Sequence, residues 1–247
     1  MKTQMPDNNT DPMMILRDEF KPIAKLVKAK STYIDIYQKQ GDYFWYVDYH
    51  DDGPSSKAIR FENYIKLWSY DELLFSIVRP GEEIRFTDML RLEGFHAMWS
   101  YKISEKKYEM PCVLKELYAL DPEVLSGWCS VVFDECYQVI RRFIAEVEEK
   151  YGDLNGFHIH NYERSRINAA FAHIARGEYE QALRLLKKAY NRGEYTNRCF
   201  GDCSNDLRDV LINYCGAQIA CVPWTRRMVE GYFEDDTVRK TVASVWS

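Results

Sequence analysis

The chain has 247 residues, of which 46% are hydrophobic and 29% are charged, and its formal net charge is −5. A chain of this length and composition can bury a sizeable core, which excludes disorder for its bulk. Neither half of the chain is basic and no long run of one charge stands out, so the linear sequence lacks the basic stripe that nucleic-acid-binding proteins require.

The N-terminal segment, residues 1–12, is polar, contains two prolines and lacks the apolar core of a signal peptide. We expect it to be a disordered tail. No later apolar run approaches the roughly 18 residues that cross a bilayer, so we expect a cytoplasmic protein that does not associate with membranes. The seven cysteines, an odd number, then predict reduced thiols rather than a disulfide framework.

The first predicted helix begins at Asp11-Pro12, because Asp is a good N-cap residue and Pro fits the first helical turn. After it, three segments alternate polar and apolar residues with the period of a half-buried strand: residues 31–39, 43–50 and 58–67. Short turns containing Gly41 and Gly53 separate them, which predicts an antiparallel meander.

The chain after the meander is predicted to form two short helices and a fourth strand. Ser69 and Glu72 have the spacing of a capping box at the start of the first helix. The second helix is predicted over residues 86–92, and the alternation over residues 95–103 indicates the strand. Residues 104–107, which are all polar or charged, are predicted to form a solvated loop.

From residue 111 onward the pattern is helical. Asp121-Pro122 begins a long helix that reaches about Lys150 and carries apolar residues on a wide face. Further helices are predicted over residues 166–190, over about 205–221 and beyond Pro223. These elements predict an α+β fold, with an N-terminal antiparallel sheet of three to four strands flanked by helices over residues 13–110 and a C-terminal helical bundle over residues 111–247. One continuous domain is an alternative.

Residues 166–190 predict a helical hairpin with its turn at Gly177. The phrase Gly177-Glu-Tyr-Glu-Gln-Ala182, followed by Leu186 and Ala189, resembles the second half of a tetratricopeptide repeat. The resemblance implies a protein-binding scaffold. A single hairpin within a bundle remains the alternative, because no second copy at the repeat period is evident.

The sequence contains few candidate residues for catalysis or metal binding. His158 and His160 could lie on one side of an extended segment, and with Cys199 and Cys203 they are the candidates for a metal site, although the cysteine spacing is not typical of zinc proteins. The serine-hydrolase, phosphate-binding-loop, dinucleotide-binding and HExxH motifs are not found. We therefore expect no cofactor, and an enzyme is only the second alternative to a binding protein.

The order helix, three-strand meander and short helix, with the phrase from Tyr64 to Phe75, resembles bacterial domain families of unknown function that occur beside polymorphic toxins and are proposed immunity proteins. The resemblance spans residues 13–150. It implies a protein partner, in the simplest case a toxin that the chain neutralises by occlusion.

The strand-end residues of the meander are the predicted binding surface. Aromatic anchors surrounded by a charged rim are typical of protein interfaces. The anchors would be Trp45, Tyr46 and Tyr49, and the rim would be Asp48, Asp51 and Asp52. The alternative function is a scaffold or regulator whose helical half grips a peptide or a subunit.

Overall fold

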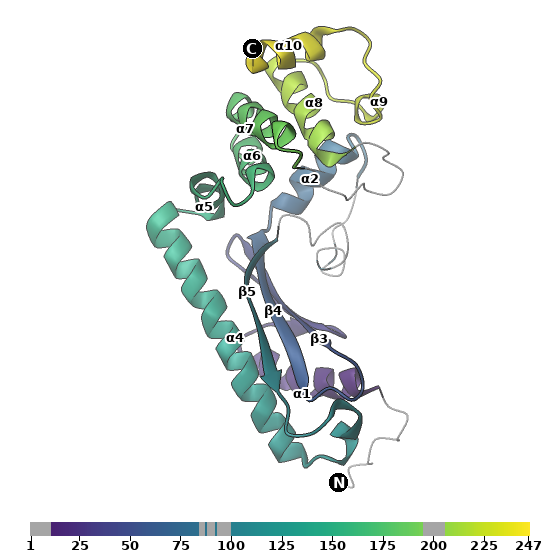
Figure 1. The fold of residues 1–247 in the computed structure, drawn as a ribbon, viewed down its shortest axis with the longest axis vertical. Coiled ribbons are helices and arrows are strands. Elements are labelled where there is room, and N and C mark those ends of the chain that lie inside the picture. The colour runs from purple at the N-terminus through teal and green to yellow at the C-terminus, as the bar shows by residue number, and fades with distance from the viewer. Residues whose placement is uncertain (1–10, 84–86, 88–91, 93–99, 195–205) are drawn as a thin grey trace. The chain divides into compact units, whose positions relative to one another are not determined.

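The computed structural model describes residues 11–83, 87, 92, 100–194 and 206–247. The chain divides into two compact units, Met1–Trp68 with Ser100–Ala145 and Ser69–Trp99 with Glu146–Ser247. The described elements confirm the α+β class (Figure 1). The units do not follow the predicted boundary at residue 110, because most of the long helix after residue 121 belongs to the sheet unit and the short helix after Ser69 belongs to the helical unit.

The first unit contains an antiparallel sheet with the strand order β1-β2-β3-β4-β5 among the described residues. Its strands are β1 (Lys30–Ser31), β2 (Asp35–Gln40), β3 (Tyr43–Asp51), β4 (Ala58–Leu67) and β5 (Tyr101–Glu109). Helix α1 (Pro12–Leu26), the short 3-10 helix η2 (Leu114–Ala119) and the helix α4 (Pro122–Tyr151) accompany the sheet. The meander is confirmed, with one strand more than the predicted maximum of four.

Strand β5 is where the sequence-based prediction was wrong. Residues 104–107 were expected to form a loop, yet they pair with residues 60–63 of β4. Their charged side chains suit a strand at the edge of the sheet, where Lys and Glu remain in solvent and discourage pairing with another chain. The strand predicted over residues 95–103 is described only from residue 100, and the described strand begins at Tyr101.

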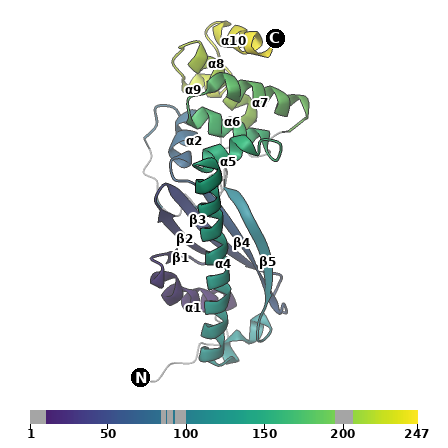
Figure 2. The same ribbon diagram turned by 90° about the vertical axis from the view of Figure 1, so that its left-hand side faces the viewer.

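One face of the sheet carries the core of the first unit. Phe20 of α1 and Trp128 of α4 both pack against Phe61 of β4, with ring centroids 5.8 and 6.3 Å apart. Side chains alternate between faces along a strand, so residues one position away from Phe61 point to the opposite face. Figure 2 shows α4 running along the sheet.

We call the opposite face, away from α1 and α4, the open face. Phe44, Tyr46 and Lys66 on this face are buried, and its partly exposed residues include the charged ones around Asp48 and Glu62.

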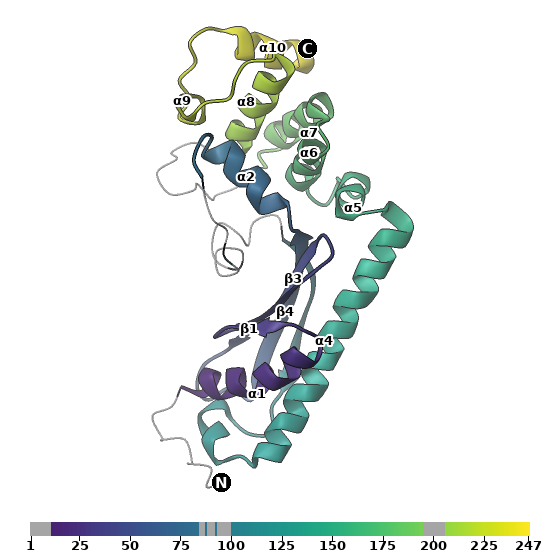
Figure 3. The ribbon, with the colours of Figure 1, turned by 180° about the vertical axis from the view of Figure 1, so that it is seen from behind.

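The second unit is helical. It contains α2 (Tyr70–Val78), α5 (Leu154–His160), α6 (Arg166–Ala175), α7 (Tyr179–Asn191), α8 (Leu207–Ile219), α9 (Arg226–Val229) and α10 (Thr237–Trp246). Helices α5 to α8 pack in chain order, each against the next, and α10 packs on α7 and α8 (Figure 3). The predicted hairpin is present as α6 and α7, with Gly177 at φ +75° between them.

Helix termini agree with the sequence at some positions and depart from it at others. Asp11 caps α1 by accepting a hydrogen bond of 2.9 Å from the Met13 amide. Ser69 occupies the N-cap of α2 but makes no side-chain capping bond, so the predicted capping box is not formed. The helix predicted over residues 86–92 lies almost wholly outside the described residues.

Within the described part of the chain, no helix combines the length and the apolar character needed to cross a membrane.

Candidate functional site

The predicted aromatic anchors are buried, which corrects their assignment to a binding surface. Trp45 and Tyr49 are 0% exposed and Tyr46 is 3% exposed. Trp45 packs on Tyr137 of α4, and Tyr49 packs on Phe20 of α1. The alternating pattern that suggested an aromatic surface is therefore the core side of the sheet, except for Tyr46, which lies on the open face and stacks on Tyr64.

The three carboxylates of the predicted rim have different structural roles. Asp51 accepts a hydrogen bond of 2.6 Å from the Gly53 amide and so stabilises the turn after β3. Asp52 accepts hydrogen bonds from Arg60 at 2.9 Å and from Lys107 at 2.6 Å. The hydrogen bonds from Lys107 and Arg60 lower the pKa of the Asp52 carboxyl. Asp48 points to the open face and belongs to a separate cluster.

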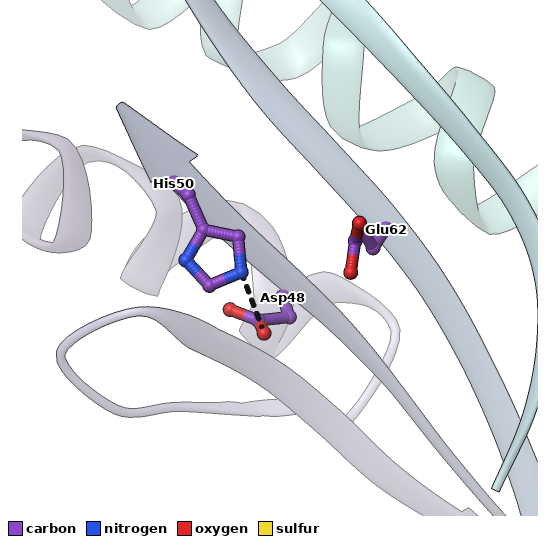
Figure 4. A group of neighbouring side chains, drawn as sticks. All are labelled: Asp48, His50 and Glu62. Atoms are coloured by element: carbon purple, nitrogen blue, oxygen red, sulfur yellow. Dashed lines mark ion pairs between the residues drawn. The ribbon is translucent and has the colours of Figure 1, made fainter. Parts of the chain in front are cut away.

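That cluster consists of Asp48, His50 and Glu62 (Figure 4). Asp48 and His50 are two positions apart on β3 and therefore share a face, and Glu62 is the direct partner of Asp48 on β4. The Nε2 atom of His50 lies 2.9 Å from Oδ2 of Asp48. One donor atom from each residue lies within 4.8 Å of the other two. The register of β3 against β4 thus brings an imidazole and two carboxylates to one point.

The two carboxylates of the cluster differ in their surroundings. Burial raises the pKa of Asp48, the negative charge of Glu62 raises it further, and His50 opposes both effects. For Glu62, burial also acts to raise the pKa, but hydrogen bonds from Tyr64 and Lys102 outweigh burial and lower it. Glu62 is therefore the carboxylate that is held ionised, and Asp48 is the one whose charge is least well compensated.

Charged residues continue from the cluster across β4 and β5. Lys102 bonds to Glu105 at 2.7 Å and to Glu62 at 3.3 Å, while Glu105 lies 3.9 Å from Arg60. With Asp52 and Lys107 these residues form a network of alternating charges on the open face. Surface pairs of this kind each contribute about 0–1 kcal/mol to stability.

The metal ligands predicted in the second half of the chain do not converge. His158 and His160 belong to the helix α5 rather than to an extended segment, and residues two apart on a helix point in different directions. His158 is buried, which lowers its pKa to about 4. Cys199 and Cys203 lie outside the described residues. Among the described residues, the group with metal-ligand geometry is Asp48, His50 and Glu62.

Helix α2 packs against other helices of the second unit. The Tyr70 ring of α2 packs edge-on against Phe171 of α6, with centroids 5.1 Å apart, and its hydroxyl donates to Asn155 Oδ1 at 2.8 Å. The Trp224 indole donates to the Ile77 carbonyl at 2.7 Å. Helix α2 packs mainly on α8 and α9 and touches the hairpin through the Tyr70 ring. Whether the hairpin is a tetratricopeptide unit stays a prediction.

Sequence reasoning identified Asp48 but missed its neighbours His50 and Glu62. The signal was present in part, since Asp48 and His50 have the i, i+2 spacing of one strand face. The contribution of Glu62 depends on strand register, which the sequence between β3 and β4 does not specify.

Comparisons of the chain with protein-family models, with curated proteins and with solved structures find no match.

Proposed function

We propose that this chain is a non-catalytic protein-binding protein that recognises its partner through the open face of the sheet. In the form that the resemblance of residues 13–150 implies, the partner is a toxin whose working surface the chain covers. The observation that carries the proposal is the charge network of β3 to β5, which lies on the sheet face turned away from α1 and α4.

The composition of this face favours a specific partner over a generally basic one. It carries the carboxylates of Asp48, Asp52, Glu62 and Glu105 and the cations of Arg60, Lys102 and Lys107. Their side chains are between 13% and 52% exposed. Alternating charges reward a partner with the complementary pattern and penalise partners that bring like charges together. Such a surface contributes selectivity and rapid association more than raw affinity.

A cytoplasmic location forms part of the proposal. The five described cysteines, Cys112, Cys129, Cys136, Cys215 and Cys221, are free thiols. Free thiols in a chain with several cysteines are typical of a reducing compartment.

The first experiment is affinity capture from a native lysate with the tagged chain, read by quantitative mass spectrometry. The test variant exchanges two charges on the open face, Glu105→Lys with Lys107→Glu. The matched control exchanges the ion pair on α7, Glu180→Lys with Arg184→Glu, whose side chains are 55% and 63% exposed. Both double variants keep the net charge of the chain.

We expect one stoichiometric partner that is captured by the wild type and by the α7 variant and is lost with the open-face variant. Equal capture by both variants would place the interface elsewhere. Absence of any partner above background would contradict a binding function, provided that the captured chain retains its thermal unfolding midpoint.

A further inference from the structure

The geometry points to a binding site for a divalent first-row transition-metal ion at Asp48, His50 and Glu62. The inference shares Asp48 and Glu62 with the surface of the protein-binding proposal, but its test measures metal binding and is decided separately from partner binding. It rests on the convergence of those atoms, on their chemistry and on the placement of two carboxylates directly opposite each other on neighbouring strands.

The donor set selects the class of ion. One imidazole nitrogen and two carboxylates suit Zn²⁺, Mn²⁺ and related ions, whereas Mg²⁺ and Ca²⁺ prefer oxygen alone. Three protein ligands that leave further coordination positions open are typical of zinc sites that accept water or another ligand. The His50 side chain is 43% exposed, so an ion held here would face solvent on one side.

The distances are compatible with a single ion after a small side-chain adjustment. Bonds of about 2.1 Å from one ion place its ligand atoms roughly 3–3.5 Å apart. His50 Nε2 and Asp48 Oδ2 already lie 2.9 Å apart. The largest separation in the group is within 4.8 Å, so a small shift of the Glu62 carboxylate that keeps its bond to Tyr64 brings the third ligand into range.

The electrostatics favour an additional cation at this point. Asp48 and Glu62 face each other across neighbouring strands, and like charges in directly opposite positions destabilise a sheet. Asp48 is 21% exposed, and its Oδ1 atom is buried without a hydrogen-bond donor. An ion bound at Oδ2 would add positive charge to this carboxylate.

The neighbouring donors orient the ligands and also compete with the ion. Tyr64 donates to Oε2 of Glu62, which holds that carboxylate in the way that outer partners hold metal ligands. Lys102 lies 3.3 Å from Oε1 of Glu62, but its side chain is 45% exposed and can move into solvent. Replacing Lys102 with Met should therefore strengthen metal binding.

The probe is Mn²⁺, because its free aqueous ion has a sharp paramagnetic resonance signal that disappears on binding, and because it has little affinity for the thiols of this chain. The purified full chain is titrated with Mn²⁺, and Zn²⁺ is then added as a competitor. We expect one Mn²⁺ site per chain, displaced by Zn²⁺. Asp48→Asn, His50→Gln and Glu62→Gln should each weaken binding by at least about tenfold.

Two matched controls separate this site from adventitious binding. His160→Gln removes an imidazole from the second unit, and Asp209→Asn removes a carboxylate that is 47% exposed on α8. Neither should change the affinity. His50→Gln is the deciding variant, because the His50 side chain is 43% exposed, and its thermal unfolding midpoint is measured to show that the fold is kept.

A Mn²⁺ signal unaffected by the wild-type chain would overturn the inference. So would an affinity that survives His50→Gln, or one that falls equally with His160→Gln. Proton resonances of the His50 ring provide a second readout in the wild-type chain, since bound Mn²⁺ should broaden them before those of the other histidines.

Discussion

Trp45 of β3 packs against Tyr137 of α4, with ring centroids 5.6 Å apart and planes inclined by 49°. This contact joins the long helix to the centre of the sheet, and Trp45 is 0% exposed. Trp45→Ala should therefore lower the free energy of unfolding by about 3–5 kcal/mol, the range for aromatic truncation in a core.

The control for Trp45 is Leu26→Ala, since Leu26 is 84% exposed at the end of α1. Its replacement should change stability by no more than about 0.5 kcal/mol. Urea denaturation followed by circular dichroism measures both variants. If Trp45→Ala were as stable as the wild type and lost only partner binding, Trp45 would belong to the binding surface and not to the core.

Gly216 of α8 allows the close approach of α10. A Cβ atom at Gly216 would lie 2.6 Å from Cγ2 of Val242 and 3.0 Å from Cγ1 of Val238. Gly216→Ala should destabilise the chain by about 1–3 kcal/mol through overpacking. Gly127→Ala is the matched control, because a Cβ atom at Gly127 on α4 meets nothing within 4 Å. That change should stabilise the chain by about 0.5–1 kcal/mol through helix propensity. Thermal unfolding of the two variants should shift in opposite directions.

His158 should make stability depend on pH. Burial lowers its pKa in the folded chain to about 4, from an ordinary value of 6.5. As the pH falls below about 6.5, the unfolded chain binds a proton that the folded chain does not, so the free energy of unfolding falls by about 1.4 kcal/mol per pH unit. This contribution is complete at neutral pH and is lost progressively down to about pH 4.

Denaturant titrations at pH 7 and pH 5 test this linkage by comparing the wild type with His158→Leu. The variant should lose less stability than the wild type between these two pH values. His160→Gln serves as the control and should retain the wild-type difference. An identical pH response in wild type and His158→Leu would show that His158 is not the group responsible.

Four of the described cysteines should fall into two reactivity groups. Cys129 and Cys215 are 0% exposed and Cys136 is 2% exposed, and burial raises the pKa of each thiol, that of Cys136 to about 11. Since the thiolate is the reactive form, these three should resist iodoacetamide until the chain unfolds. Cys221 is exposed and should react at once. Peptide mapping by mass spectrometry, with and without denaturant, distinguishes the groups, and rapid labelling of Cys215 in the folded chain would contradict the packing of α8.

Tyr70 should couple energetically to Asn155. Their hydrogen bond of 2.8 Å links α2 to α5 within the second unit. Tyr70→Phe should cost about 0.5–1.5 kcal/mol of unfolding free energy, the usual net value of one hydrogen bond. A double-mutant cycle with Asn155→Ala measures the coupling. Additive effects of the two replacements would mean that the bond contributes nothing to the docking of α2.

Local sequence signals by themselves determined most elements of this protein. Asp11-Pro12 located the start of α1, the alternation over residues 31–67 located the meander, and Asp121-Pro122 located the start of α4, because capping, turn formation and amphipathic periodicity depend on residues close together in the chain. Strand β5 was misplaced because an edge strand rich in Lys and Glu has the composition of a loop.

Only the tertiary structure decided which face of the sheet is covered and which side chains meet. The aromatic residues of β3 have the same alternation whether they line a core or a surface, and the packing of α1 and α4 placed Trp45 and Tyr49 in the core. The meeting of Asp48 and His50 with Glu62 depends on the register between β3 and β4, in which a shift of one residue would move Glu62 out of position. Register and helix packing arise from contacts between distant parts of the chain, which no local pattern contains.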